Sequence, residues 1–135
     1  MLHGAGALRR AFKAAGIETF NITSDATGGT TFDTCSATRT FDTVLDSALF
    51  HGLTALEIAP YVAALAAVTK PGGRLHLICF NEHEVRPGGP RRVTQNDIQA
   101  AFHSGWEIEQ IKEARYYSLI DRGGALCWIA TWRRR

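Results

Sequence analysis

The sequence predicts an α/β fold. Three segments carry this prediction. Residues 41–46 are suited to a strand, residues 58–68 repeat apolar side chains at helical spacing, and residues 75–80 form a continuous apolar run typical of a strand covered on both faces. A strand, a helix and a second strand in this order predict a right-handed parallel crossover.

The composition is that of one globular domain. The chain has 135 residues, of which 45% are hydrophobic and 21% are charged, and we expect one core over residues 1–135. No apolar run approaches the roughly 18 residues that a membrane helix needs, and the N-terminus lacks the apolar segment of a signal peptide. We therefore expect a cytoplasmic protein that does not associate with membranes.

The charge argues against a nucleic-acid partner. The net charge is +2, but residues 133–135 are all arginine, and without them 12 basic residues face 13 acidic ones. A terminal run of arginines without a basic helix is most often a solvated end.

The N-terminal part predicts a helix, a strand and a loop. Apolar residues over 8–15 recur at helical spacing, and Gly16 stands where a helix stop is expected. Residues 17–23 are suited to a strand that ends at Ser24 and Asp25. Residues 26–40 are rich in Gly, Thr and Ser and predict a loop.

The middle of the chain contains start and stop signals for two helices. Pro60 fits best at the first position of the helix over residues 58–68, and residues 71–73, Pro-Gly-Gly, are expected to end that segment. Thr94 and Asp97 have the spacing of a capping box, which predicts a second helix that ends at Gly105.

The C-terminal part predicts an antiparallel hairpin. A strand begins at Trp106, residues 121–124 form a glycine turn, and residues 125–132 return as an apolar strand. We expect this hairpin at or near one end of the sheet. Trp106, Trp128 and Trp132 are expected to pack in the core or the hairpin.

Two stretches resemble a known family. Residues 41–51 resemble the fourth strand and following loop of small-molecule class I S-adenosylmethionine-dependent methyltransferases. Residues 61–65 and 68–75 resemble the next helix, the Pro-Gly-Gly turn and the fifth strand. The resemblance covers roughly residues 17–133. It implies an incomplete Rossmann-like methyltransferase sheet with a C-terminal antiparallel hairpin. In the complete sheet the strand order is three, two, one, four, five, seven, six, with the cofactor across the carboxyl ends of strands one to four.

The N-terminal strand fits this family in two ways. In the favoured alignment, residues 17–23 resemble the third strand. In the other, residues 4–6, Gly-Ala-Gly, are a remnant of the glycine-rich cofactor loop, and residues 17–23 are the second strand. Both alignments lack the first strand.

The resemblance implies a set of site residues. Asp25 and Ala26 would contact the adenine of S-adenosylmethionine, although Asp after a strand is commonly a turn residue. Asp46 and Ser47 would face the reacting centre as further cofactor-binding residues, or else would cap the next segment. Phe50 and His51, which follow them, would line the pocket of the methyl acceptor, with His51 as the catalytic proton acceptor or as a solvated loop residue.

Two other site types are not expected. His76, Cys79 and His83 look like a metal cluster, but the odd offset from 76 to 79 directs two of these side chains to opposite faces of a strand. Ser47 and His51 lack the Gly-x-Ser-x-Gly turn of a hydrolase. We therefore expect no metal.

The functional hypothesis is methyl transfer from S-adenosylmethionine to a small-molecule acceptor. Because most of the cofactor loop is missing, we expect this polypeptide alone to bind the cofactor weakly or not at all. The alternative is a non-catalytic module that acts by self-association, as a homo-oligomer, or through a partner protein, since unpaired strand edges attract other chains.

Overall fold

The computed structural model describes residues 14–15, 40–118 and 120–135. The chain divides into two compact units, Met1–Asp33 and Thr34–Arg135, and the fold below is that of the second. The predicted strand 17–23, the loop 26–40 except its last residue, the glycines of residues 4–6, and the predicted cofactor residues Asp25 and Ala26 lie outside the described residues.

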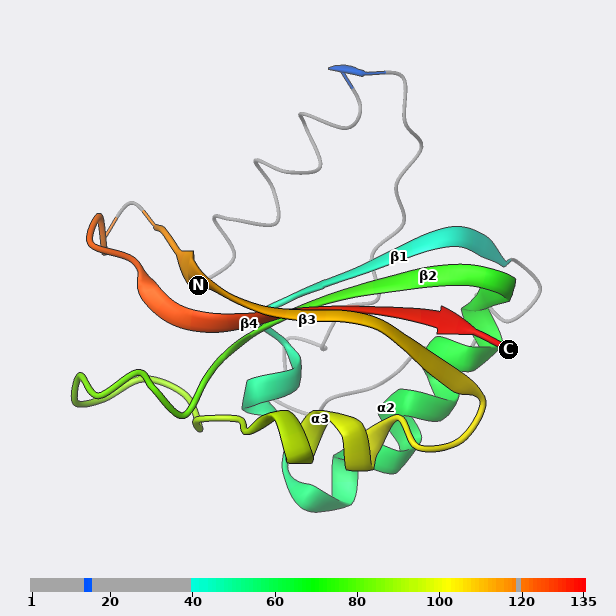
Figure 1. Cartoon of the computed structure of the whole chain (residues 1–135), viewed down its shortest axis with the longest axis horizontal. Helices are drawn as coiled ribbons and strands as arrows, with labels where there is room; N and C mark the ends of the chain where they lie inside the picture. Colours follow the sequence, from blue (N-terminus) through cyan, green and yellow to red (C-terminus); the bar gives the residue numbers. More distant parts are fainter. Residues whose placement is uncertain (1–13, 16–39, 119) are drawn as a thin grey trace, which may run out of the picture. The chain divides into compact units, whose positions relative to one another are not determined.

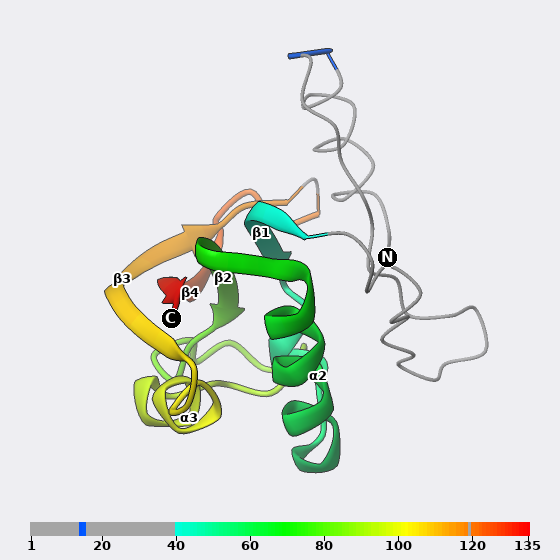
Figure 2. The same cartoon turned by 90° about the vertical axis from the view of Figure 1, so that its right-hand side faces the viewer.

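The second unit is a mixed sheet with helices on one side (Figures 1 and 2). The strand order is β1-β2-β4-β3, with β1 parallel to β2 and the other neighbours antiparallel. The predicted α/β class and the parallel pairing around a helix are thereby confirmed. The elements in chain order are β1 Phe41–Ser47, the 3-10 turn η2 Phe50–Gly52, α2 Ala55–Val68, β2 Thr69–Phe80, α3 Gln95–Ala101, β3 Trp106–Tyr116 and β4 Ala125–Arg134.

Helix α2 begins five residues before Pro60. Thr54 is its N-cap, and the Thr54 N–H donates to Glu57 Oε2 at 2.8 Å in a capping box. The prediction of Pro60 at the first position was wrong, because the capping box fixes an earlier start. The proline removes the N–H that would reach the carbonyl of Leu56. Leu56 is 90% exposed, so water can solvate that carbonyl instead.

The Pro-Gly-Gly sequence lies inside β2 rather than ending the segment. Between Phe41 and Thr43 of β1, the paired residue of β2 moves from Thr69 to Arg74, so this sequence forms an irregular bulge. A Cβ at Gly73 would lie 2.8 Å from a backbone oxygen, which excludes larger side chains.

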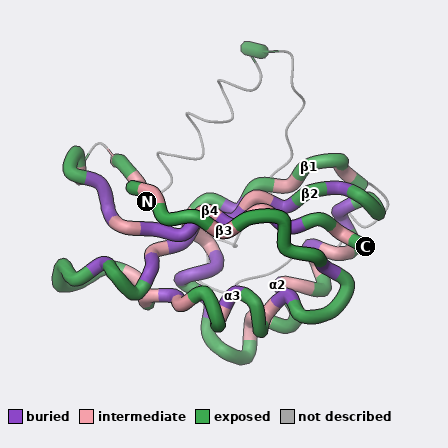
Figure 3. Tube along the Cα trace, viewed as in Figure 1, coloured by how far each residue is buried: buried purple, intermediate pink, exposed green. Residues whose placement is uncertain are grey.

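The core lies between the sheet and the two helices. Leu75, Leu77 and Cys79 of β2 are completely buried, whereas the alternate residues Ile78 and Phe80 are half-buried (Figure 3). Within the described residues, β2 is therefore fully covered on one face only, which corrects the expectation of two. The predicted packing of the tryptophans is confirmed, since Trp106, Trp128 and Trp132 are all buried.

The C-terminal hairpin and α3 follow the sequence signals. β3 and β4 pair antiparallel from Trp106 opposite Arg134 to Tyr116 opposite Ala125, and β3 ends the strand order. The α3 capping box is also confirmed, because Asp97 N–H donates to Thr94 Oγ1 at 3.0 Å and Thr94 N–H donates to Asp97 Oδ2 at 2.9 Å.

Two further observations complete the fold. The helix α3 ends at Ala101 rather than at Gly105, which instead adopts φ +77° in the turn before β3. In the part of the chain that the structure describes, none of the helices has the length and apolar character required to span a bilayer.

Candidate functional site

The carboxyl ends of three strands meet at one edge of the sheet. β1 and β2 are parallel, and β3 runs in the same direction as β2 because each is antiparallel to β4. Ser47, Phe80 and Tyr116 are the last residues of these strands. We call this set, together with His51, the carboxyl-edge site. Ligands of open α/β sheets bind at such edges.

Asp46 is buried near the end of β1, and its carboxylate accepts hydrogen bonds from other groups of the protein. Its Oδ1 accepts from the Leu49 N–H at 2.8 Å, and its Oδ2 accepts from the Tyr61 hydroxyl. Burial raises the pKa of the carboxyl group to about 6, against the opposing effect of these hydrogen bonds. The bond to Leu49 stabilises the turn after β1, and the bond to Tyr61 joins that turn to α2. Asp46 is only 5% exposed, so little of its carboxylate is open to a cofactor.

The turn that Asp46 holds contains a residue in the left-handed region. Ala48 has φ +71°, and its N–H donates to the carbonyl of Ile78 on β2 at 2.9 Å. Such a conformation is unfavourable for a residue with a Cβ. The hydrogen bonds of Asp46 and Ala48 together fix the direction in which the chain leaves the sheet towards η2.

His51 is oriented by the backbone of β2. Its Nδ1 accepts from the Phe80 N–H at 3.0 Å, and its ring meets the Phe80 ring edge-on with centroids 4.9 Å apart. Burial, and then the positive charges of Arg92 and Arg91, lower the pKa of the imidazole to about 4. The ring is therefore neutral at pH 7 with its proton on Nε2.

This tautomer changes the role that His51 can take. A neutral imidazole whose Nδ1 accepts a hydrogen bond has Nε2–H to donate and no free lone pair. In the described part of the chain Nε2 makes no hydrogen bond, and it is not sealed from solvent. The geometry disfavours the predicted proton acceptor and offers a hydrogen-bond donor instead. The other open reading, a solvated loop residue, does not hold, since His51 is 7% exposed.

Phe50 belongs to the core. It is completely buried, with ring centroids 5.9 Å from Tyr61 and 6.2 Å from Phe102. Phe50 therefore has no exposed surface with which to line the acceptor pocket that the sequence had led us to expect.

Ser47 and Tyr116 face each other at the carboxyl-edge site. Ser47 Oγ and the Tyr116 hydroxyl are 3.5 Å apart, and the Tyr116 ring lies 6.1 Å from Phe80 between centroids. Ser47 is among the site residues predicted from the sequence, whereas Tyr116 and Phe80 are not. Their position at strand ends that share an edge was the available signal.

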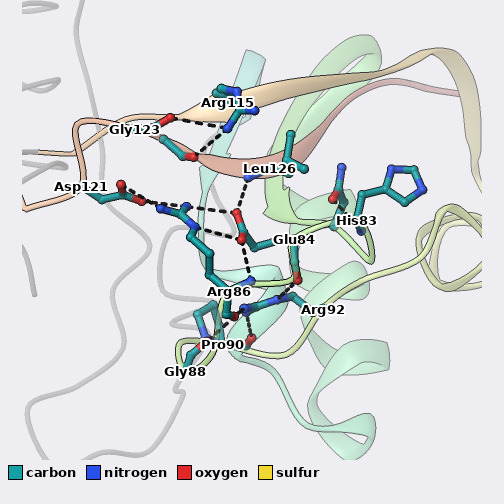
Figure 4. Close-up of polar contacts among 12 residues, drawn as sticks. His83, Glu84, Arg86, Gly88, Pro90, Arg92, Arg115, Asp121, Gly123 and Leu126 are labelled. Atoms are coloured by element: carbon teal, nitrogen blue, oxygen red, sulfur yellow. Dashed lines mark hydrogen bonds and ion pairs between the residues drawn. The ribbon is translucent and has the colours of Figure 1, made fainter.

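The loop after β2 is built around Arg92. Its guanidinium donates to the backbone carbonyls of Glu84, Arg86, Gly88 and Pro90 at 2.6 to 3.0 Å (Figure 4). The central carbon of the same group lies 5.7 Å from the centroid of the Phe80 ring. Arg92 thus holds the loop against the carboxyl-edge site.

Glu84 anchors this loop to the hairpin. Its Oε2 accepts from the Leu126 N–H of β4 at 2.7 Å, and Arg86 donates to both of its oxygens (Figure 4). Arg86 also pairs with Asp121 in the hairpin turn at 2.9 Å. The hydrogen bonds from Arg86 and Leu126 lower the pKa of Glu84 to about 2.

The three residues that resemble a metal cluster in the sequence have different partners. His76 Nδ1 lies 3.0 Å from Thr131 Oγ1, Cys79 is buried, and His83 Nδ1 lies 2.5 Å from Glu113 Oε2. Among the residues that the structure describes, no three His, Cys, Asp or Glu side chains are grouped for a metal ion.

No family model matches the sequence, but curated relatives do. The chain is 25% identical over 83 residues to a 2-heptyl-1-hydroxyquinolin-4(1H)-one methyltransferase of Mycobacteroides abscessus. The match covers 60% of this chain and 37% of the relative, so it spans well under half of that protein's length.

Solved structures share the fold at low sequence identity. One is from work on the conversion of a disulfide bond into a thioacetal group during echinomycin biosynthesis, with TM-score 0.64, 22% identity, and coverage of 93% of this chain and 60% of that one. Another is the N-methyltransferase NodS from Bradyrhizobium japonicum WM9 in complex with S-adenosylhomocysteine, with TM-score 0.56, 15% identity, and coverage of 95% and 61%.

These similarities define the class of fold. The sheet order β1-β2-β4-β3, with its C-terminal hairpin, corresponds to strands four, five, seven and six of the class I methyltransferase sheet. The chain has the fold of S-adenosylmethionine-dependent methyltransferases, and its resemblance to the small-molecule members of that family is confirmed.

Proposed function

We propose that the protein takes part in methyl transfer from S-adenosylmethionine to a small-molecule acceptor, with the carboxyl-edge site as the place where the methyl end of the cofactor meets the acceptor. The observation that carries this proposal is the convergence of His51, Phe80 and Tyr116 with Ser47 at the ends of three strands that run in the same direction. The curated relative is a methyltransferase of a small heteroaromatic molecule, which supports an acceptor of that size.

Methyl transfer requires few chemical functions from the protein. S-adenosylmethionine supplies an activated methyl group, and the protein must orient an acceptor atom in line with it and exclude water. Phe80 and Tyr116 offer flat surfaces for orientation, while the Nε2–H of His51 and the Ser47 hydroxyl offer directional hydrogen bonds.

The test is a titration with S-adenosylhomocysteine followed by thermal unfolding. We expect a small, saturable rise in melting temperature that requires millimolar ligand, because the sequence predicts weak cofactor binding. Ser47→Trp should abolish the rise, because Ser47 is a predicted cofactor-binding residue and the larger side chain would block the end of the site that the cofactor enters. Ser104→Trp is the matched control, since Ser104 is an exposed serine next to the opposite end of β3.

The absence of any rise would favour the alternative, a non-catalytic module of the same fold. Sedimentation of the same sample would then distinguish self-association from a single-chain species that needs another partner.

A further inference from the structure

The polar groups of the carboxyl-edge site are all able to donate hydrogen bonds. His51 presents Nε2–H, and Ser47 and Tyr116 present hydroxyl groups 3.5 Å apart. The nearby carboxylates are occupied elsewhere: Asp46 accepts from Leu49 and Tyr61, and Glu84 accepts from Arg86 and Leu126. The site therefore contains donors for an acceptor molecule and no unoccupied carboxylate among its described residues to take a proton from it.

Arg92 adds a positive charge that is not paired. Its guanidinium donates four hydrogen bonds, all of them to neutral backbone carbonyls. In the described part of the chain, no carboxylate forms an ion pair with it. Carbonyl dipoles fix the guanidinium but leave its net charge in place. The charges of Arg92 and Arg91 act in the same direction as burial, the larger cause, in lowering the pKa of the His51 imidazole.

The surface that this field acts on is aromatic. The centroid of the half-buried Phe80 ring lies 4.9 Å from that of His51 and 6.1 Å from that of Tyr116. The central carbon of the Arg92 guanidinium lies 5.7 Å from the same centroid. Aromatic side chains favour a planar partner, in stacked or edge-on contact. A planar molecule that carries negative charge on one heteroatom would satisfy both the rings and the donors.

We propose that the methyl acceptor of this site is an aromatic hydroxyl compound bound as its oxyanion, a phenolate. This inference rests on the proposed function. The phenolate oxygen attacks the methyl carbon of S-adenosylmethionine, the new C–O bond forms as the C–S bond breaks, and the electron pair of that bond returns to sulfur. No proton is transferred in this step, so no general base is required.

The test uses 4-nitrophenol as the probe, because its phenolate absorbs visible light and its neutral form does not. The full chain is titrated into the probe at a pH at which the free probe is mostly protonated. We expect binding to lower the pKa of the probe by about one unit, which is a tenfold preference for the phenolate. 4-Nitroanisole, which has the same ring without an ionisable hydroxyl, should bind at least several-fold more weakly.

Variants assign the effect to the site. Tyr116→Phe should reduce the preference for phenolate by about threefold to tenfold, the usual effect of one lost hydrogen bond to a charged group. Tyr117→Phe is the matched control and should have no effect, because Tyr117 is 65% exposed and packs on Gly124.

Three results would overturn the inference: the bound probe stays protonated, 4-nitroanisole binds as tightly as 4-nitrophenol, or neither probe binds at millimolar concentration. The proposed function is tested separately, because the titration with S-adenosylhomocysteine needs no acceptor. Phenolate binding without cofactor binding would support the preference of the site and contradict the proposed function.

Discussion

The Nδ1 atom of His51 accepts a hydrogen bond of 3.0 Å from the backbone N–H of Phe80, the last residue of β2. This contact joins the turn after β1 to the end of the next strand. It also decides which nitrogen of the imidazole carries the proton, and hence that the side chain donates rather than accepts at the site.

His51→Phe should destabilise the protein by about 1 to 3 kcal/mol, because it leaves the Phe80 N–H without its acceptor. His51→Asn should cost less, since its amide oxygen can approach the position of Nδ1. Urea unfolding at neutral pH measures both differences. Equal losses for the two variants would show that the hydrogen bond contributes little.

Asp46 should make stability fall between about pH 4 and pH 6. Its folded pKa of about 6 lies above the ordinary value of 3.8, so the folded state binds more protons than the unfolded state in this window. The favourable contribution is complete below the ordinary pKa and is lost as the pH rises through the folded value. A shift of about two pKa units corresponds to a loss of order 3 kcal/mol.

The measurement for Asp46 compares urea unfolding of the wild-type protein and Asp46→Asn from pH 4 to pH 7. The difference in stability between the two proteins should change with pH in the direction given above. A constant difference across that range would mean that the carboxyl group titrates at its ordinary value.

Glu84 should have the opposite pH dependence. Its pKa is lowered from 4.5 to about 2, so its contribution is present above pH 4.5 and is lost as the pH falls through the folded value. Glu84→Gln should remove this part of the acid sensitivity, seen in melting temperatures between pH 5 and pH 2. Glu107→Gln is the control, because Glu107 makes a surface ion pair with Arg133 and is 46% exposed.

Ala48→Gly should stabilise the protein by about 1 kcal/mol, because glycine adopts φ +71° without the steric cost of a Cβ. Ala63→Gly in the exposed part of α2 should destabilise it by a similar amount, since glycine disfavours helix interiors. Thermal unfolding of the two variants gives the signs directly. A loss of stability in Ala48→Gly would show that the turn after β1 is relaxed.

The parts of the fold that were predictable from sequence are those that local patterns determine. The strand at residues 75–80, the Thr94 and Asp97 capping box and the glycine turn of the hairpin each depend on residues close in the chain. Pro60 was misplaced because two start signals competed, and the Thr54 and Glu57 capping box prevailed.

The site was less predictable because its geometry depends on contacts between distant residues. The sequence located Ser47 and His51 but gave no sign that Asp46 bonds to Tyr61, 15 positions later, or that His51 bonds to Phe80, 29 positions later. The carbonyls gathered by Arg92 become neighbours only when the loop folds. Periodicity contains no information on such pairs.

The most direct test of the central claim, that the carboxyl-edge site is the ligand site, is an amide NMR titration with S-adenosylhomocysteine up to millimolar concentration. The account predicts saturable shift changes at Ser47, His51 and Phe80, which lie at the shared edge of β1 and β2. Changes confined to the groove between α2 and α3, lined by residues such as Ala63 and Ala101, or no changes at all, would contradict it.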